Sequence, residues 1–233
     1  MKTYLVLLML FCSSWLFAQN QNSQIVESVT NEDMSSRIST QMRFIFPEFT
    51  DGLVFFHTSS FSSGKLNYNM LVGEMQFLNN EEVLALNARD IAAVNINNRQ
   101  FFPFKGNEFT EELLSTDKFN LRVRRKGNVA PYAKKGAYGT SSSTSSITSY
   151  TSMSGDGRMY DLAVAEDIIV SVRYYYYLVG NNGKYIQISN VRTFTRQFPA
   201  FRKQIEEYVK ENKLRFDNAE DLKHLLEYCS GLS

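Results

Sequence analysis

The chain has 233 residues, with 25 Lys and Arg against 24 Asp and Glu, which gives a formal net charge of +1. The hydrophobic share of 43% and the charged share of 21% are those of a globular protein, so wholesale disorder is excluded. The near-zero charge argues against a protein that coats nucleic acid, and two Cys exclude a disulfide-rich scaffold.

The first 18 residues have the features of a secretory signal peptide. Lys2 gives a basic start, residues 5–11 are apolar, and Ala18 is a small residue at a plausible cleavage point. The apolar run is shorter than the roughly 20 residues that span a bilayer. We expect cleavage after Ala18 and soluble export; the alternative is an uncleaved N-terminal anchor.

Cleavage after Ala18 would also change the net charge and the number of Cys residues. Cys12 follows the bulky Phe11, which disfavours a lipoprotein in which this Cys is acylated. Removal of residues 1–18 deletes Lys2 and no acid, so the expected mature chain is neutral. Cys229 then remains as the only thiol, and its place in an apolar helical pattern predicts a buried structural role.

Residues 19–43 are polar and lack strand periodicity, so they predict a mobile leader or a short docked helix. From residue 44 to 189 short apolar segments alternate with turn signals such as Asn97-Asn98 and Asn181-Asn182-Gly183. Leu66, Tyr68 and Met70 show the period-two pattern of a half-buried strand. This spacing predicts an antiparallel meander, a sandwich or a partly closed barrel.

Residues 127–157 interrupt the strand pattern. Most of residues 140–152 are Ser or Thr, which bury too little apolar area to offset the entropy of ordering them. We therefore predict a flexible loop, either a plain insertion or a lid or adhesive tract. Strand signals return at residues 159–164 and, more strongly, at 168–179, where both faces carry aromatic side chains and predict a central strand.

The C-terminal residues 190–233 change to a helical period. Two apolar stripes have helical spacing: Phe201, Ile205, Tyr208 and Val209, and then Leu222, Leu225, Leu226 and Cys229. The predicted fold class is α+β: an antiparallel β-rich body followed by two or three C-terminal helices packed on the same domain.

The sequence contains no recognisable catalytic or metal-binding motif. His57 and His224 lack the spacing of metal ligands, and no Gly-x-Ser-x-Gly element is present. Neighbouring carboxylates such as Glu111-Glu112 and Glu220-Asp221 are interpreted as solvated charges. We therefore assign no catalytic residues, cofactor or metal ligands from the sequence.

A basic run and two tyrosines form the candidate contact surface, for an anionic glycan, a lipid headgroup or a protein partner. The more ordinary interpretation is a solvated strand face for the basic residues and cross-strand packing for the tyrosines. The candidate residues are Arg122, Arg124, Arg125, Lys126, Lys134, Lys135, Tyr175 and Tyr177.

Packing and turn motifs spread over residues 44–230 provide a resemblance. They are FPEF at 46–49, DG at 51–52, KLNYN at 65–69, GEMQF at 73–77, FP at 198–199, KLRF at 213–216, EDL at 220–222 and LEY at 226–228. The set resembles a family of exported Bacteroidota proteins with no established activity. The resemblance implies a Gram-negative cell envelope and carries over no catalytic residues.

Export, an aromatic sheet and the basic run together predict a non-enzymatic binding or accessory protein of the periplasm or outer envelope. Its expected partner is an envelope protein, an anionic glycan or a lipid headgroup, with no nucleic acid and no membrane span after signal removal. The alternatives are a glycan- or peptidoglycan-directed hydrolase, whose site assembles only in three dimensions, and a structural subunit of an envelope assembly.

Overall fold

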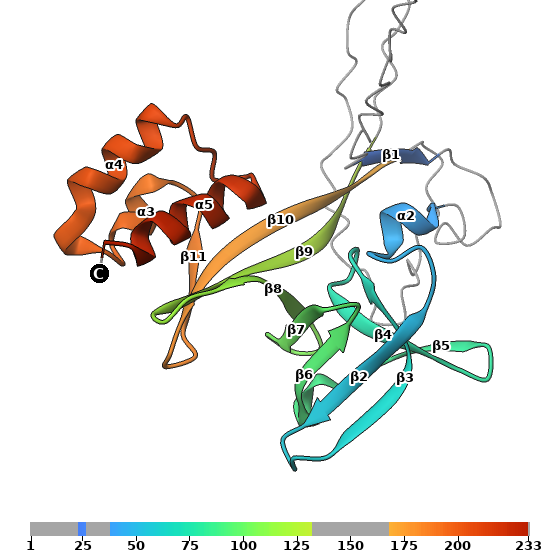
Figure 1. The fold of residues 1–233 in the computed structure, drawn as a ribbon. Helices are drawn as coiled ribbons and strands as arrows, with labels where there is room; N and C mark the ends of the chain where they lie inside the picture. The colour runs from blue at the N-terminus through green and yellow to red at the C-terminus, as the bar shows by residue number, and fades with distance from the viewer. Residues whose placement is uncertain (1–22, 27–37, 132–167, 233) are drawn as a thin grey trace, which may run out of the picture.

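The computed structural model describes residues 23–26, 38–131 and 168–232, and its β-rich body and helical end are joined by a long two-stranded ribbon (Figure 1). The described strands form one open antiparallel sheet of eleven strands. Their order is β1-β10-β9-β8-β7-β6-β2-β3-β4-β5, and β11 pairs with the remaining part of the β10 edge. The predicted α+β class is confirmed, in the form of an open meander.

Most neighbouring strands are joined by short turns. The strands are β1 (Ser23–Val26), β2 (Thr50–Phe56), β3 (Phe61–Asn69), β4 (Glu74–Asn79), β5 (Glu82–Ala85), β6 (Ile91–Ile96), β7 (Arg99–Pro103), β8 (Phe109–Ser115), β9 (Phe119–Pro131), β10 (Ile168–Gly180) and β11 (Tyr185–Ile188). Asn97 and Asn98 have φ of +48° and +61°, the left-handed pair that a tight β6–β7 hairpin requires. Two pairings depart from sequence order, because β6 returns to lie beside β2 and β1 lies beside β10.

The turn between β3 and β4 folds back onto the sheet. The Phe109 N–H donates to the Gly73 carbonyl at 2.7 Å, and the Gly127 N–H donates to the Leu71 carbonyl at 2.7 Å. Gly73 has φ of +78°, and a Cβ there would lie 3.1 Å from the Arg125 carbonyl oxygen. Only glycine fits this close approach without strain, and the contact fixes the backbone of β9 at Arg125.

The ribbon of β9 and β10 has thirteen residue pairs, from Phe119 opposite Gly180 to Pro131 opposite Ile168. Even-numbered residues of β10 lie on one face. Those nearest its start, Ile168, Val170 and Val172, pack into a core with β2, β3, β4, β6 and β7. Further along the same face, Tyr176 and Leu178 pack into a second core with the helices. The ribbon therefore joins two cores on a single face.

The helical end contains α3 (Val191–Thr195), a 3-10 turn at Pro199–Phe201, α4 (Arg202–Glu211) and α5 (Ala219–Ser230). Asn190 and Thr193 form a capping box on α3, and the Asn218 side chain accepts hydrogen bonds from the first backbone N–H groups of α5. The two predicted apolar stripes pack into the second core. His224 is exposed on α5.

The leader contains more structure than the sequence indicated. Ser23–Val26 forms β1 and pairs with Ile168–Ser171 of β10, although the leader shows no strand period. Thr40–Arg43 forms the short helix α2, capped by the Ser39 hydroxyl. Four residues supported by a neighbouring strand need no periodicity of their own, because β10 supplies the hydrogen-bond partners.

Residues 127–131, which were predicted to start a flexible loop, continue β9 opposite β10. The rest of that loop, the predicted strand at 159–164 and the expected signal peptide at 1–18 lie outside the described residues.

Cys229 tests the second core directly. The side chain is 2% exposed, and burial raises the pKa of its thiol to about 12. We expect the thiol of a chain beginning at Gln19, which lacks Cys12, to react with a thiol reagent orders of magnitude more slowly when folded than in denaturant. Equal reaction rates in both states would contradict the packing of α5.

Candidate functional site

The predicted contact residues of β9 divide between the two faces of the ribbon. Arg122, Arg124 and Lys126 alternate onto one face, whereas Arg125 lies on the face that packs on the cores. Lys134 and Lys135 lie outside the described residues. The structure therefore brings together only part of the predicted set.

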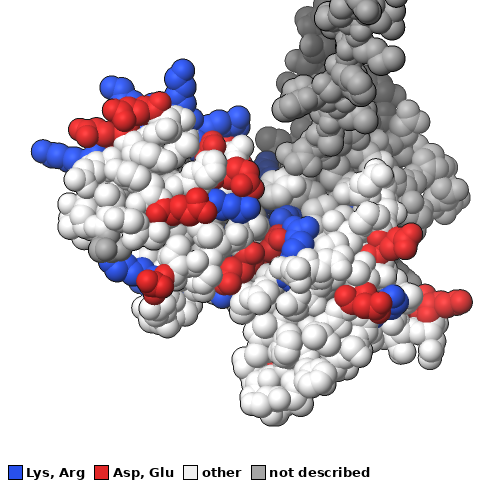
Figure 2. All heavy atoms as spheres, in the orientation of Figure 1, with Lys and Arg blue, Asp and Glu red and all other residues white. Residues whose placement is uncertain are grey.

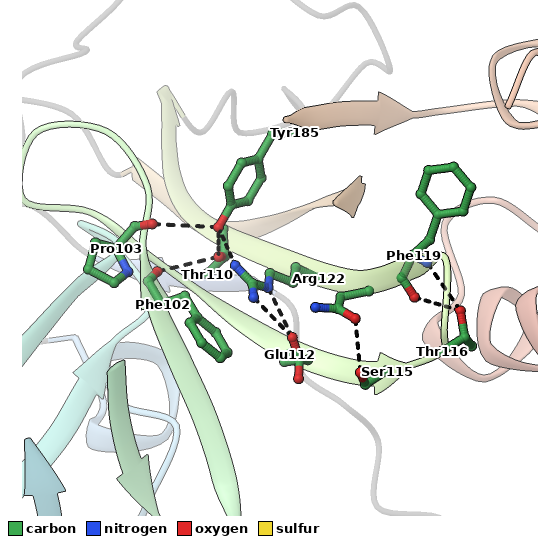
Figure 3. A network of polar contacts seen from close by, with 10 residues as sticks. Phe102, Pro103, Thr110, Glu112, Ser115, Thr116, Phe119, Arg122 and Tyr185 are labelled. Atoms are coloured by element: carbon green, nitrogen blue, oxygen red, sulfur yellow. Dashed lines mark hydrogen bonds and ion pairs between the residues drawn. The ribbon is translucent and has the colours of Figure 1, made fainter. Parts of the chain in front are cut away.

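Arg122 is held in a polar network with β8 and β11 (Figure 3). Its Nη2 lies 3.0 Å from Glu112 Oε2, and its Nη1 donates to the Tyr185 hydroxyl at 2.8 Å. The guanidinium also lies 3.7 Å from the centre of the Phe102 ring. Arg122 is only 9% exposed, so its charge is used within the protein.

Arg124 and Lys126 share one carboxylate on the same face. Glu108 accepts a hydrogen bond from Arg124 Nη2 at 2.8 Å and from Lys126 Nζ at 3.3 Å. Tyr175 lies beside Arg124, whose guanidinium carbon is 5.6 Å from the ring centre. Tyr177 is buried and packs on Phe104 and Tyr185.

The interpretation of this strand as a solvated basic face is wrong for Arg122 and Arg125, which are 9% and 7% exposed. Acidic residues of β8 lie opposite β9 and take up the charge. Glu112 faces Arg122 across the hairpin, a register that the Glu111-Glu112 pair and the short β8–β9 turn could have revealed. Use of this face for contact with a partner stays a prediction.

The other face holds a cluster of the buried Glu111 and Arg125 and the partly exposed Arg99. Glu111 Oε2 accepts from Arg99 Nη2 at 2.8 Å and lies 2.5 Å from Arg125 Nη2. Burial alone would raise the pKa of Glu111, but hydrogen bonds from Arg99 and the charge of Arg125 outweigh it and lower that pKa. Glu111 is therefore an anion shared by two cations.

The cluster leaves part of Arg125 without a partner. Its Nη1 is buried and makes no hydrogen bond in the described part of the chain. The guanidinium lies near the rings of Tyr68 and Tyr174, at 5.9 and 5.6 Å from their centres. The buried Arg125 and the partly exposed Arg99, whose side chain is 34% exposed, face one anion, so the cluster carries a net charge of +1.

Arg125 lines a cleft of about 660 Å³ that lies between the two cores. One wall is α2 and the segment after it, the floor is the β9–β10 ribbon, and the opposite wall is the start of α5. The lining residues are Gln41, Met42, Phe44, Ile45, Met70, Leu113, Val123, Arg125, Val172, Tyr174, Tyr176, Arg215, Asp217, Asn218, Ala219 and Glu220.

The charges at the rim of the cleft are paired with each other. Arg215 donates two hydrogen bonds to Asp217, at 3.0 and 2.8 Å, and Glu220 accepts one from Lys223 at 2.8 Å. In Figure 2 acidic and basic side chains lie close together along the boundary between the helical end and the sheet. Arg125 is therefore the buried cation of the lining that has a guanidinium nitrogen without a hydrogen-bond partner among the described residues.

The ionisable groups of the cleft do not form an acid–base pair. The hydrogen bond from Arg215 holds the pKa of Asp217 below its ordinary value, whereas a general acid needs a raised pKa. Burial raises the pKa of Tyr176 to about 12, so this hydroxyl stays protonated. Among the described residues, no His lines the cleft.

An open groove of about 680 Å³ lies on the opposite face of the ribbon. Its lining includes His57, Phe102, Asn120, Arg122 and Tyr185. Because Arg122 is already bonded to Glu112 and Tyr185, this groove has no unpaired charge from that residue.

Comparison with known proteins gives no further identification. No protein-family model, no curated protein and no solved structure matches the chain. Within the described residues, no group of three or more His, Cys, Asp and Glu is placed to hold a metal ion, and no helix has the length and apolar character needed to cross a membrane.

Sequence reasoning missed the cleft and the role of Arg125. The side chains come from α2, β9, β10 and α5, which are distant in sequence. One signal was present: Arg124 and Arg125 are adjacent, so one of them had to lie on the apolar face of the strand.

Proposed function

We propose that the protein is a non-enzymatic binding protein exported to the periplasm or the outer envelope of a Gram-negative bacterium. Export is supported by the basic start, the apolar run and the small residue at Ala18. The resemblance of residues 44–230 to exported Bacteroidota proteins points to the same compartment.

The cleft is the observation that carries the proposal. Its volume of about 660 Å³ falls in the range of pockets that hold small molecules, roughly 300–1,000 Å³. Its lining is more polar than apolar, and it combines one buried arginine with several aromatic and aliphatic side chains. Because separate cores support the two walls, the cleft is part of the folded framework.

Binding is better supported than hydrolysis at this cleft. A glycan hydrolase needs two carboxyl groups facing the substrate, one of them protonated. Asp217 and Glu220 lie at the rim, and each forms an ion pair with a neighbouring cation. The lowered pKa of Asp217 is unsuited to proton donation.

The opposite face of the ribbon is the site we assign to an envelope partner, whether a protein, an anionic glycan or a lipid headgroup. Its accessible groups include the exposed Arg173, the Lys126 ammonium, whose side chain is 46% exposed, and the half-buried Tyr175.

The proposal is tested by recovering the ligand. The full chain with a C-terminal tag is isolated from the envelope of a Gram-negative host and denatured, and the released small molecules are identified by mass spectrometry. Gln41 is exposed and lines the cleft, so Gln41→Trp should obstruct it without disturbing a core. We expect a compound that copurifies with the native chain and is depleted in the variant.

The same preparation reports on export, because the mature protein should begin at Gln19. Equal recovery of every compound from both proteins would count against a ligand in the cleft. A chain retained in the cytoplasm with Met1 intact would count against export.

A further inference from the structure

We propose that the cleft binds a small monocarboxylate with an apolar or aromatic body, and that Arg125 holds the carboxylate. This inference rests on the proposed binding function and assigns its ligand class. Four features of the described residues support this inference. They are a guanidinium nitrogen of Arg125 without a hydrogen-bond partner, the net positive charge of its cluster, the side chains that form the walls of the cleft, and the charges at the rim.

The free nitrogen is the starting point. Arg125 is 7% exposed, and its Nη2 contacts Glu111 while its buried Nη1 lacks a hydrogen-bond partner in the described chain. A buried charged donor without a partner is costly, because it has lost water and gained nothing in exchange. A ligand oxygen on Nη1 would remove that cost.

The charge of the cluster selects an anion. Arg99 already engages both oxygens of Glu111, so Glu111 cannot fully neutralise Arg125 as well. One negative charge from a ligand would bring the cluster of the buried Arg125 and Glu111 and the partly exposed Arg99 to neutrality. Guanidinium groups match the planar geometry of carboxylates, which favours this acceptor.

The rim disfavours a ligand with two negative charges. Asp217 and Glu220 lie at the entrance, and each is already paired within the protein. A phosphate dianion would leave the cluster with a net charge of −1 and bring a second charge towards these carboxylates. The expected head group is therefore a monoanion.

The walls define the rest of the ligand. Phe44 and Tyr174 are partly exposed and provide aromatic surface, whereas Met70 and Val172 are 9% and 6% exposed and add a small aliphatic area. These side chains would gain from contact with an apolar body, whereas a short polar acid such as acetate would leave most of the cleft to water.

The test compares two probes with the same body and different heads, 4-phenylbutyrate and 4-phenylbutyramide. Binding to the full chain is measured by calorimetry and by ligand-observed NMR at neutral pH. We expect the acid to bind about tenfold or more tightly than the amide, since a charged hydrogen bond distinguishes them. Phenyl phosphate, which carries a second charge, should bind more weakly than the acid.

Arg125→Gln should remove this preference. The affinity for the acid should fall about tenfold or more, whereas the affinity for the amide should change little. We expect the variant to fold, because Arg99 keeps Glu111 paired. Arg173→Gln is the matched control, since Arg173 is exposed on the opposite face of the ribbon and should leave both affinities unchanged.

Two further variants keep the test decisive if Arg125→Gln does not fold. Arg125→Lys retains the positive charge but lacks the planar guanidinium group. It should therefore lower the affinity for the acid and leave the affinity for the amide unchanged. Gln41→Trp should lower the affinity for both probes, because it obstructs the cleft rather than the head-group site.

The outcomes separate the two proposals. Equal affinities for acid and amide, both lost in Gln41→Trp, would overturn the carboxylate assignment and leave the binding function intact. No binding of either probe at millimolar concentration would also overturn the assignment, and the envelope-isolated ligand would then test the binding function on its own.

Discussion

Glu111→Gln should lower the free energy of unfolding by about 3–5 kcal/mol, because it leaves the buried Arg125 and the partly exposed Arg99 without their anion. The neutral amide keeps the size of the side chain, so the loss reports on charge and hydrogen bonding rather than on a cavity. Urea denaturation at pH 7 measures the change. Glu206→Gln is the control: Glu206 pairs with Arg202 on an exposed helix face, and its loss should cost less than about 1 kcal/mol.

The same substitution predicts a change in pH dependence. The pKa of Glu111 is lower in the folded state, so its stabilisation is complete above the ordinary glutamate pKa of about 4.3. It is lost as pH falls below that value and through the folded pKa. The native chain should therefore lose more stability than Glu111→Gln between neutral pH and acid. Parallel pH curves for the two proteins would contradict the ionised state of Glu111.

Phe101→Ala and Leu225→Ala should each destabilise the whole described fold. Phe101 is fully buried in the first core and stacks on Tyr68 with ring centres 5.3 Å apart, and Leu225 is fully buried in the second core. The expected losses are about 3–5 kcal/mol for Phe101→Ala and 2–5 kcal/mol for Leu225→Ala. Phe61→Ala, at a side chain 69% exposed, should cost less than about 0.5 kcal/mol.

The form of the unfolding transition is the sharper part of this prediction. Because β9 and β10 contribute to both cores, we expect both substitutions to shift one cooperative transition, observed by circular dichroism and by tyrosine fluorescence. Two transitions, each moved by only one of the substitutions, would show that the cores unfold independently.

The sequence predicted features whose cause is local. The Asn97-Asn98 turn and the stripe that begins at Phe201 each depend on residues within one or two turns of chain. Cys229 was assigned to the core from its spacing alone, and its burial is confirmed. Short-range sterics and periodicity determine such elements, so a single sequence contains them.

Features that depend on distant partners were missed. β1 forms because the edge of β10 is present, and β6 lies beside β2 although three strands separate them in the chain. The cluster of Arg99, Glu111 and Arg125 requires three strands in register, which no local pattern encodes. The basic run was noticed, but its division between two faces and its pairing with β8 become evident only when the register is known.

The ribbon has a consequence for the time course of folding. Hairpins such as β2–β3 and β6–β7 join neighbouring residues and can close quickly, whereas β9 and β10 pair across residues 132–167, and β1 pairs across a still longer stretch. Closing long loops costs entropy before any contact compensates for it, so ribbon formation should limit the folding rate. A chain destined for export would then remain extended long enough to be translocated, and would become compact only after its last long-range strand pairs had formed.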